Sequence, residues 1–166
     1  MALNVVIMAA GKGTRMKSAQ PKVLHRLAGT TLLQHVLAAA APLGAQRTVI
    51  VTGHGADAVE ASVAGSGALC VRQQPQLGTG HAVQQAVPAL DEAGETTLVL
   101  NGDVPLIRTE TAAALVAACG GTRLALLTVE LADPSGYGRI VRDGGRIVRV
   151  VEHKDADAAT REIREV

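Results

Sequence analysis

The sequence predicts an α/β fold, with a mostly parallel, twisted sheet, helices on both of its faces and a β-hairpin near the C-terminus. Short apolar runs alternate with segments whose apolar residues recur at helical spacing, as in a Rossmann-like sheet. From Asp133 onward, turn residues replace this alternation. A chain of 166 residues that is 48% apolar suits one domain with a sizeable core, built from Ala, Val, Leu and Ile because Phe and Trp are absent.

The first expected strand, Leu3 to Ile7, is a mostly apolar run, which is typical of a strand buried on both faces. After a glycine-containing loop, Thr30 or Thr31 can cap a helix whose apolar residues recur up to Ala40, before Pro42 ends it. The further expected elements are strand 48–52, helix 56–63, strand 68–72, helix 79–90, strand 96–100, a helix from a cap at Thr109 to Gly120-Gly121, and strand 124–130.

The last part of the chain predicts a hairpin followed by a polar segment. Residues 140–142 and 146–151 flank Asp143-Gly144-Gly145, a turn that allows the positive φ of a tight hairpin. Residues 157–166 predict a polar helix or the approach to another element, and no closing signal follows. Because no internal repeat or low-complexity linker divides the sequence, we expect one domain over 1–166.

The loop from Met8 to Lys22 carries the main indication of function. Gly11 and Gly13 let the backbone turn and let a ligand approach main-chain N–H groups that a Cβ would shield. Pro21 opposes a continuous helix before Lys22. The cationic side chains of this loop are Lys12, Arg15, Lys17 and Lys22. We therefore predict that the loop binds a triphosphate.

The charges of the chain are strongly polarised. No Asp or Glu precedes Asp57, so residues 1–56 carry a formal charge of +6 and the remaining residues −5. A duplex-binding protein more often spreads Lys and Arg along a helix or face, and a single tyrosine with no Phe or Trp disfavours stacking of single strands. We expect a small polyanion rather than a nucleic acid as partner; a merely solvated basic loop is the alternative.

Two well-known phosphate loops do not fit the sequence. A P-loop needs a glycine five residues before its Gly-Lys pair, and counting back from Gly11-Lys12 reaches Val6. A dinucleotide-binding loop needs a small residue where Met16 stands, and an acidic residue after the second strand, where Thr52-Gly53-His54 has none. The spacing therefore disfavours a P-loop NTPase and an NAD-binding protein.

Three segments are expected at the carboxyl ends of parallel strands, where ligands bind in open α/β sheets. They are the first loop, residues 73–80 and Asn101-Gly102-Asp103. Asp103 suits a Mg²⁺ site, because this ion often takes one or two carboxylates and adds waters and phosphates; a role in its own turn is the alternative. Gln73 offers a donor and an acceptor that match a base edge such as uracil, and Gly78 allows close backbone approach. Thr79 either caps the following helix or contacts the ligand.

The remaining polar and reactive residues predict no further chemistry. Cys70 and Cys119 are expected to be buried, reduced thiols, and the five histidines share no metal-ligand spacing. No stretch approaches the roughly 18 apolar residues of a membrane span, and no basic region precedes the first apolar run. We expect a cytoplasmic protein without a membrane span.

Six motifs are distributed over essentially the whole chain. They are Met8-Ala-Ala-Gly-Lys-Gly-Thr-Arg-Met16, Pro21-Lys-Val-Leu-His25, Gln76-Leu-Gly-Thr-Gly-His81, Gly102-Asp-Val-Pro105, Gly136-Tyr-Gly-Arg139 and Val151-Glu-His-Lys-Asp-Ala156. Together they resemble the nucleotidyltransferase domain of bacterial N-acetylglucosamine-1-phosphate uridyltransferase, which is usually joined to a glucosamine-1-phosphate acetyltransferase. The first motif alone indicates only sugar nucleotidyltransferases in general, and the combination is much more specific.

The resemblance implies the nucleotide-diphospho-sugar transferase type of fold and a set of site residues. Lys22, Arg15 and Asp103 are implied to be catalytic, with the two cations on the phosphates and Asp103 holding the Mg²⁺ cofactor. Gly138 and Glu152 are implied to contact the N-acetylglucosamine part. The other implied substrate contacts are Met8, Ala9, Ala10 and Gly11 on the nucleotide, Gln73 and Gly78 on uracil, and Thr79, Asn101 and Gly102.

The implied reaction transfers a uridylyl group from UTP to N-acetylglucosamine-1-phosphate. Its products are pyrophosphate and UDP-N-acetylglucosamine, a precursor for cell-envelope synthesis. Two alternatives stay open: a related sugar-phosphate nucleotidyltransferase, and a nucleotide-binding module without turnover.

The sequence departs from this family in two ways. Asn101 stands where relatives often carry tyrosine. The family's domain continues with an Asn-Thr-Gly stretch and a second metal-binding side chain, followed by a hexapeptide-repeat acetyltransferase domain, whereas this sequence ends at Val166. We therefore expect an incomplete nucleotidyltransferase domain over 1–166 that is itself inactive, and a homotrimer only through the absent β-helix domain.

Overall fold

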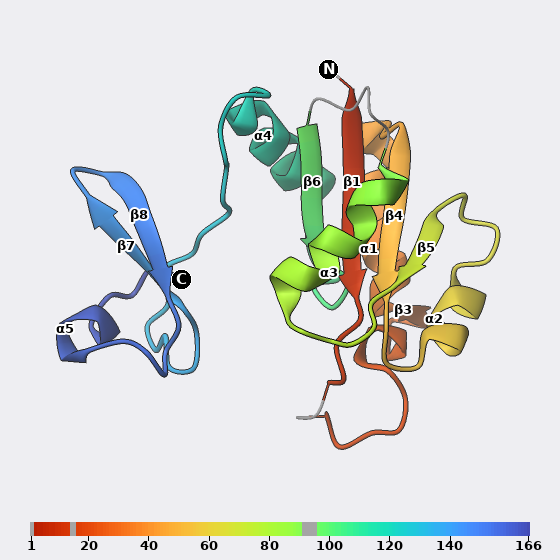
Figure 1. Cartoon of the computed structure of the whole chain (residues 1–166), viewed down its shortest axis with the longest axis horizontal. Helices are drawn as coiled ribbons and strands as arrows, with labels where there is room; N and C mark the ends of the chain where they lie inside the picture. The colour runs from red at the N-terminus through yellow and green to blue at the C-terminus, as the bar shows by residue number, and fades with distance from the viewer. Residues whose placement is uncertain (1, 14–15, 91–95) are drawn as a thin grey trace. The chain divides into compact units, whose positions relative to one another are not determined.

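The computed structural model describes residues 2–13, 16–90 and 96–166. The chain divides into two compact units, residues 1–125 and 126–166, and each is described by itself. Figure 1 gives the labels of the main helices and strands. Within the described residues, no helix has the length and apolar character that crossing a membrane requires.

The first unit is built on a four-stranded sheet in the order β5-β4-β1-β6 (Figure 1). The strands are β1 (Leu3–Ala9), β4 (Arg47–Thr52), β5 (Leu69–Arg72) and β6 (Thr96–Asn101). All three pairings are parallel, so the carboxyl ends of the four strands meet at one edge. The chain first adds strands on one side of β1 and then crosses to place β6 on the other. This reversal beside β1 is where open α/β sheets bind their ligands.

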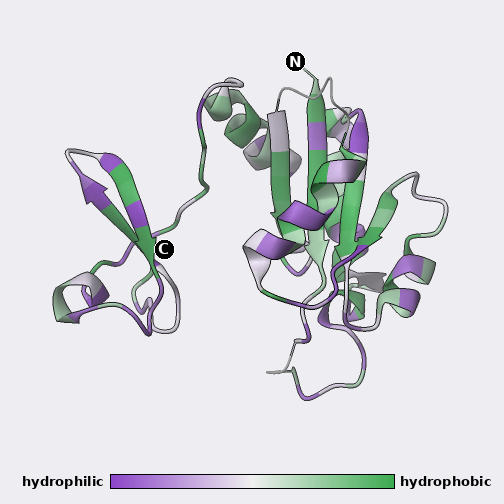
Figure 2. Cartoon of the chain, in the orientation of Figure 1, coloured by the Kyte–Doolittle hydropathy of each residue, from purple (hydrophilic) through white to green (hydrophobic). Residues whose placement is uncertain are grey.

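Helices cover both faces of this sheet, as the sequence predicted. The helices of this unit are α1 (Leu32–Ala40), α2 (Ala56–Ser62), α3 (Thr79–Ala86) and α4 (Thr109–Cys119). On one face, Val5 and Ile7 of β1 join a core cluster with residues of α1, α2 and α4, while on the other face Val6 packs with Ala82 and Ala86 of α3. In Figure 2, β1 and β4 are largely green, the colour of hydrophobic residues, as expected for strands that are buried on both faces.

Short elements complete the first unit. They are the 3₁₀ turns η2 (Lys22–Leu24), η3 (Ala41–Leu43) and η4 (Val87–Ala89), and the two-residue strands β2 (Arg26–Leu27) and β3 (Thr30–Thr31), which pair with each other.

Local sequence explains where two of the helices begin. Thr31 caps α1 and forms a reciprocal capping box with Gln34, which confirms one of the two predicted caps. The prediction that Thr109 caps α4 is wrong, because the N-cap is Arg108 and Thr109 is the first helical residue. The Thr109 hydroxyl instead donates to Ala39 O at 2.8 Å, which ties the start of α4 to the end of α1.

The second unit contains the predicted hairpin, β7 (Arg139–Asp143) and β8 (Arg146–Val151), and a short helix α5 (Ala158–Arg161) capped by Asp157. The chain's last residues pair with the start of this unit through reciprocal backbone hydrogen bonds between Val129 and Val166, each 2.9 Å long. The predicted polar segment over 157–166 therefore consists of one helical turn, α5, and a C-terminal end that pairs with the start of the unit.

The predicted strand over 124–130 is wrong. Within the described residues, this segment forms no strand, and its end pairs with the chain's last residues through the Val129–Val166 hydrogen bonds and an isolated bridge between Glu130 and Glu165. Leu124 and Leu127 have 87% and 60% of their surface exposed, so the apolar run is not buried in a sheet. An apolar run favours a strand only when a neighbouring strand satisfies its backbone, and periodicity does not reveal that neighbour.

Candidate active site

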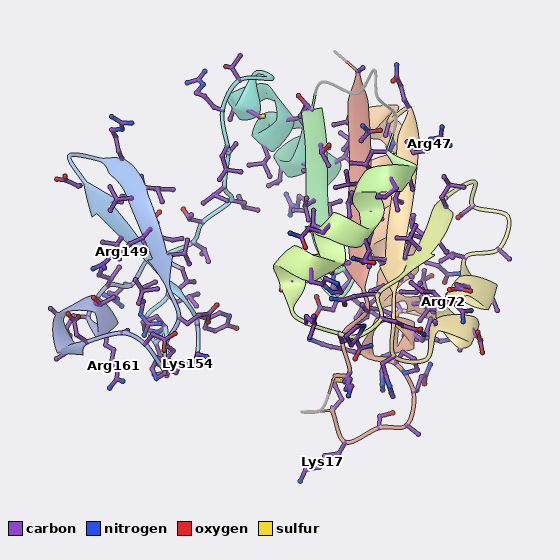
Figure 3. The ribbon with its side chains drawn as sticks, in the orientation of Figure 1. Lys17, Arg47, Arg72, Arg149, Lys154 and Arg161 are labelled. Carbon is purple, nitrogen blue, oxygen red and sulfur yellow. The ribbon has the colours of Figure 1, made fainter. Side chains whose placement is uncertain are left out.

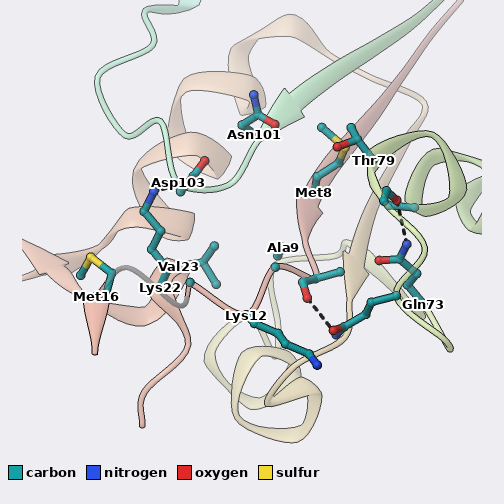
Figure 4. A pocket seen from close by; sticks show the side chains of 16 residues that line it. Met8, Ala9, Lys12, Met16, Lys22, Val23, Gln73, Thr79, Asn101 and Asp103 are labelled. Carbon is teal, nitrogen blue, oxygen red and sulfur yellow. Dashed lines mark hydrogen bonds and ion pairs between the residues drawn. The ribbon is translucent and has the colours of Figure 1, made fainter. Parts of the chain in front are cut away.

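A pocket of about 730 Å³ opens at the carboxyl edge of the sheet in the first unit (Figure 4). Its walls come from the loop after β1, the loop between β5 and α3, and the end of β6. The lining residues are Met8, Ala9, Ala10, Gly11, Lys12, Gly13, Met16, Lys22, Val23, Gln73, Gln76, Gly78, Thr79, Ala82, Asn101 and Asp103. The three segments expected from the sequence thus line one cavity, whose size suits a nucleotide-sized ligand.

The first loop is held against its neighbours by hydrogen bonds to one backbone carbonyl. Ala10 O accepts from Gln76 Nε2 at 3.0 Å and from His54 N at 3.3 Å. Gly53 makes this close approach possible, because a Cβ there would lie 2.5 Å from Gln76 Nε2 and 2.9 Å from Ala10 O. The start of the loop is therefore placed by two segments that lie far from it in sequence.

The far end of the loop returns to the pocket through a second close contact. Gly13 has φ +58°, and a Cβ there would lie 2.9 Å from Lys22 Cβ. A glycine accommodates both the left-handed backbone and the contact. Lys22 is thereby brought beside the backbone of the glycine loop, at the start of the η2 turn.

Lys22 and Asp103 form an ion pair at one side of the pocket. Lys22 Nζ lies 2.7 Å from Asp103 Oδ2, and the two side chains are 39% and 35% exposed. Asp103 follows the end of β6, where Gly102 N donates to Met8 O at 2.9 Å and locks this turn onto β1. A cation and a carboxylate, both accessible to solvent, therefore face the space beside the glycine loop.

The Gln73 side-chain amide lies at the other end of the pocket. Gln73 is 3% exposed, and its Nε2 lies 2.9 Å from Gly78 O and 3.1 Å from His81 Nδ1. Its backbone N–H donates to Thr52 O at 2.8 Å, which extends the pairing between β4 and β5 by one residue. Figure 4 shows Gln73 and Thr79 on one side of the cavity and Lys22 with Asp103 on the other.

A charged network behind this end fixes the last residue of β5. Arg72 donates to Glu60 and Asp57 of α2, and Thr52 Oγ1 donates to Glu60 Oε1 at 2.9 Å. The hydrogen bonds from Arg72 hold the pKa of Glu60 below its ordinary value. Because Gln73 follows Arg72 directly, this network also restrains the start of the loop that carries Gln73.

The structure brings most of the predicted site residues of the first unit together. Met8, Ala9, Ala10, Gly11, Lys22, Gln73, Gly78, Thr79, Asn101 and Asp103 all line the pocket. Gly102 does not line it, but a Cβ there would lie 2.9 Å from Met8 O, so this glycine permits the close packing behind the wall. Thr79 begins α3 and makes no side-chain cap, since the N-cap is Gly78. Arg15 lies outside the described residues.

The predicted sugar residues, Gly138 and Glu152, lie in the second unit and are near one another. A Cβ at Gly138 would lie 3.3 Å from Val150 Cγ1 and 4.0 Å from Glu152 Oε2. Arg139 is 2% exposed, and its guanidinium donates to the backbone carbonyls of Tyr137 and Arg161. The buried Arg139 therefore shapes the Gly136-Tyr-Gly-Arg139 turn, which the sequence did not reveal.

Gln76 is the main site residue that sequence reasoning left without a role. It begins the Gln76-Leu-Gly-Thr-Gly-His81 motif and lies two positions before Gly78, the glycine expected to approach a base. Its hydrogen bond to Ala10 spans 66 positions, so only the folded chain shows it. Met16, Val23 and Ala82 also line the pocket as apolar wall, for which the sequence had no distinguishing pattern.

The described side chains that line the pocket could supply only some of the oxygen ligands that a divalent cation needs. Among the described residues, no group of three or more His, Cys, Asp and Glu side chains could hold a metal ion. Asp103 offers one carboxylate in an open site, which fits an ion such as Mg²⁺ that takes its other oxygens from waters and phosphates.

Residues 5–159 match the family profile described as the MobA-like NTP transferase domain. The chain is 66% identical to the bifunctional protein GlmU of Methylibium petroleiphilum and 63% identical to that of an Acidovorax species, strain JS42. Each of these matches covers 99% of this chain, and they span 37% and 36% of the respective relatives. The chain thus corresponds to little more than a third of these curated relatives.

Solved structures share the fold. HddC from Yersinia pseudotuberculosis, in a crystal structure with GMP-PN, superposes with a TM-score of 0.67 at 26% identity, over 90% of this chain and 68% of that one. A nucleotidyl transferase from Methanothermobacter superposes with a TM-score of 0.64 at 25% identity, over 82% of this chain and 64% of that one.

Proposed function

The chain belongs to the MobA-like NTP transferase family, and from this membership we propose that it carries the uridylyltransferase site of a bifunctional enzyme. The reaction would join UTP and N-acetylglucosamine-1-phosphate, giving UDP-N-acetylglucosamine and pyrophosphate for peptidoglycan and lipopolysaccharide precursors. The observation that carries the proposal is the convergence of the glycine loop, the Lys22–Asp103 pair and Gln73 on one pocket. High identity to proteins named GlmU supports the choice of substrates.

The chemistry needs no nucleophile from the protein. A phosphate oxygen of the sugar phosphate attacks the α-phosphorus of UTP, a new P–O bond forms, and the bond from that phosphorus to the oxygen bridging to the β-phosphate breaks. Pyrophosphate leaves with the electron pair of that bond. Because the attacking phosphate is already anionic at neutral pH, catalysis consists mainly of alignment and charge neutralisation.

The first loop supplies the phosphate end of this mechanism. Its backbone from Ala9 to Gly13 lines the cavity, and Lys12 and Lys22 line it with cationic side chains. Lys22 would leave Asp103 for the phosphates as the ligand enters and would stabilise the charge that develops on pyrophosphate. The family resemblance implies the same task for Arg15, and we propose it here.

Asp103 would hold the divalent cation, which we take to be Mg²⁺. When bound, such an ion neutralises phosphate charge and orients the phosphate oxygens. The ion pair with Lys22 keeps a neutral local charge balance at Asp103 in the free protein. When the ligand binds, Lys22 would pair with its phosphates and Asp103 with its cation.

The second unit holds the two residues implied to contact the sugar. Gly138 lies next to the Glu152 carboxylate, whose oxygens can accept hydrogen bonds from sugar hydroxyl or amide groups. We propose that these residues contact the N-acetylglucosamine moiety.

Pyrophosphate release from UTP and N-acetylglucosamine-1-phosphate with Mg²⁺ tests the proposal. It is measured on this chain and on a fusion that continues it with the remainder of the Methylibium relative. Turnover by the fusion supports the reaction, and turnover by the 166-residue chain would show in addition that residues 1–166 suffice. Absence of turnover in both, with UTP bound, favours another sugar phosphate or a nucleotide-binding module. Parallel reactions with the other nucleoside triphosphates and sugar phosphates separate these outcomes.

A further inference from the structure

The Gln73 amide is held by two neighbours that both face its nitrogen. Nε2 lies 2.9 Å from Gly78 O and 3.1 Å from His81 Nδ1. A backbone carbonyl only accepts hydrogen bonds, so the atom beside Gly78 must be the amide nitrogen. Both amide hydrogens then have partners within the protein. The amide oxygen is the group that remains for a ligand, and Gln73 lines the pocket (Figure 4).

The same geometry assigns the proton of His81. Because Gln73 donates, His81 Nδ1 accepts, and the neutral ring carries its proton on Nε2. The Gln85 amide lies 3.2 Å from Nε2. Its oxygen accepts that proton when the amide is turned by 180°, which exchanges oxygen and nitrogen without changing its shape. His81 and Gln85 are four residues apart on α3 and therefore share one face of the helix.

Hydrogen-bond direction at Gln73 distinguishes the two pyrimidines. Uracil carries a hydrogen on N3 between two carbonyl oxygens, whereas N3 of cytosine is a bare acceptor. An amide oxygen opposite N3 therefore attracts uracil and repels cytosine. The first turn of α3, beginning at Thr79, leaves backbone N–H groups without helical partners at this end of the pocket, and these suit the uracil carbonyls.

We propose that His81 is a positioning residue for base selection, which holds Gln73 with its amide oxygen toward the base and so makes the site prefer uridine over cytidine nucleotides. The inference rests on the proposed uridylyltransferase function. If the Gln73 amide were reversed, its nitrogen would face the base and would suit cytosine N3 instead. Gly78 O and His81 Nδ1 both oppose that reversal, because each is an acceptor that would then face the amide oxygen.

Binding of UTP and CTP to three variants of the chain tests this role. His81→Leu removes the acceptor at similar size, and His81→Asn keeps an acceptor near the place of Nδ1. Gln84→Leu, on an exposed part of the same helix, is the matched control. We expect His81→Leu to lower the ratio of CTP to UTP dissociation constants by about tenfold, as expected for one lost orienting hydrogen bond. His81→Asn should restore most of the ratio, and Gln84→Leu should leave it unchanged.

The possible results distinguish a failure of the His81 role from a failure of the proposed uridylyltransferase function. A wild-type chain that binds UTP no better than CTP contradicts uridine selection and with it the proposed function. A wild-type preference that His81→Leu retains overturns only the role of His81. In the fusion with the Methylibium remainder, a positioning role predicts a rise in KM for UTP with little change in kcat, whereas general damage to the fold lowers the folded fraction and thus kcat.

A measurement without substitutions covers the case in which His81→Leu does not fold. The nitrogen chemical shifts of His81 in ¹⁵N-labelled wild-type protein report which ring nitrogen carries the proton. We expect the Nε2–H tautomer in the neutral, ligand-free ring. An Nδ1–H tautomer would place two donors face to face at Gln73 and would overturn the inference.

Discussion

Lys22 Nζ and Asp103 Oδ2 lie 2.7 Å apart, which joins the end of the first loop to the end of β6 across 81 positions of sequence. Each side chain is more than a third exposed. An ion pair of this exposure contributes about 0–1 kcal/mol to stability, so a ligand can separate it at small cost. The pair therefore holds a cation and a carboxylate ready beside the pocket without making them unavailable to a charged ligand.

Replacing Lys22 by alanine should lower kcat in the fusion with the Methylibium remainder by a factor on the order of 10² or more, because a charge that stabilises the leaving pyrophosphate is lost. Pyrophosphate release at saturating UTP measures the effect. Arg47→Ala is the control, since Arg47 begins β4 at the opposite edge of the sheet from the pocket (Figure 3). Turnover near the wild-type value in Lys22→Ala would refute the assignment of Lys22.

Asp103→Asn removes the carboxylate proposed to hold the cation, and it should reduce kcat of the same fusion by a similar factor and raise the Mg²⁺ concentration for half-maximal rate. Excess EDTA should abolish pyrophosphate release by the unsubstituted enzyme. Glu110→Gln is the matched control, because Glu110 is an exposed carboxylate on α4 and does not line the pocket. An unchanged Mg²⁺ dependence in Asp103→Asn would place the metal elsewhere.

Gly53→Ala should destabilise the first unit and weaken UTP binding together. The new Cβ would lie 2.5 Å from Gln76 Nε2 and 2.9 Å from Ala10 Cβ, so the loop that lines the pocket must shift. Overpacking of this kind costs about 1–3 kcal/mol, or a fall in Tm of about 2–12 °C for a chain of this size. Thermal unfolding and calorimetric titration with UTP measure the two effects.

The folding control for that substitution is Gly80→Ala, where a Cβ meets nothing within 4 Å and the backbone needs no positive φ. Its Tm should equal or exceed that of the wild type, because alanine favours a helix over glycine. Equal Tm values for wild type and Gly53→Ala would show that the contact with Gln76 relaxes freely.

Glu165 should contribute a pH-dependent part of the stability of the second unit. Hydrogen bonds from Arg142 and Thr128 lower the pKa of Glu165 from its ordinary value of 4.5 to about 2. A carboxyl whose pKa is depressed on folding stabilises the folded state above its unfolded pKa. That contribution should decline as the pH falls from 4.5 to about 2.

Chemical unfolding of the chain between these pH values tests the expectation. Glu165→Gln should flatten the pH dependence over this range, and Glu162→Gln, at an exposed carboxyl of the same segment, should leave it in place. A wild-type slope that persists in Glu165→Gln would assign the effect to other acidic groups.

Much of the fold was predictable because its strands and helices are encoded locally. β1 is apolar apart from Asn4 since α1 and α3 cover its two faces, and that pattern is visible without coordinates. Turn residues likewise indicated the hairpin of β7 and β8. The segment 124–130 shows the limit, because apolar character alone does not provide a strand with a partner.

The sequence by itself determined the chemistry of the site: a glycine loop with its cations, no acid before Asp57, and an isolated Asp103 after an apolar strand. Tertiary structure alone decided the hydrogen-bond partners of these groups. The pairing of Lys22 with Asp103 and of Gln76 with Ala10 follows from the meeting of strand ends at one edge of the sheet, and that of Gln73 with His81 from the path of the loop between β5 and α3. Hydrogen bonds depend on distances of about 3 Å and on donor direction, and neither quantity is written in residue order.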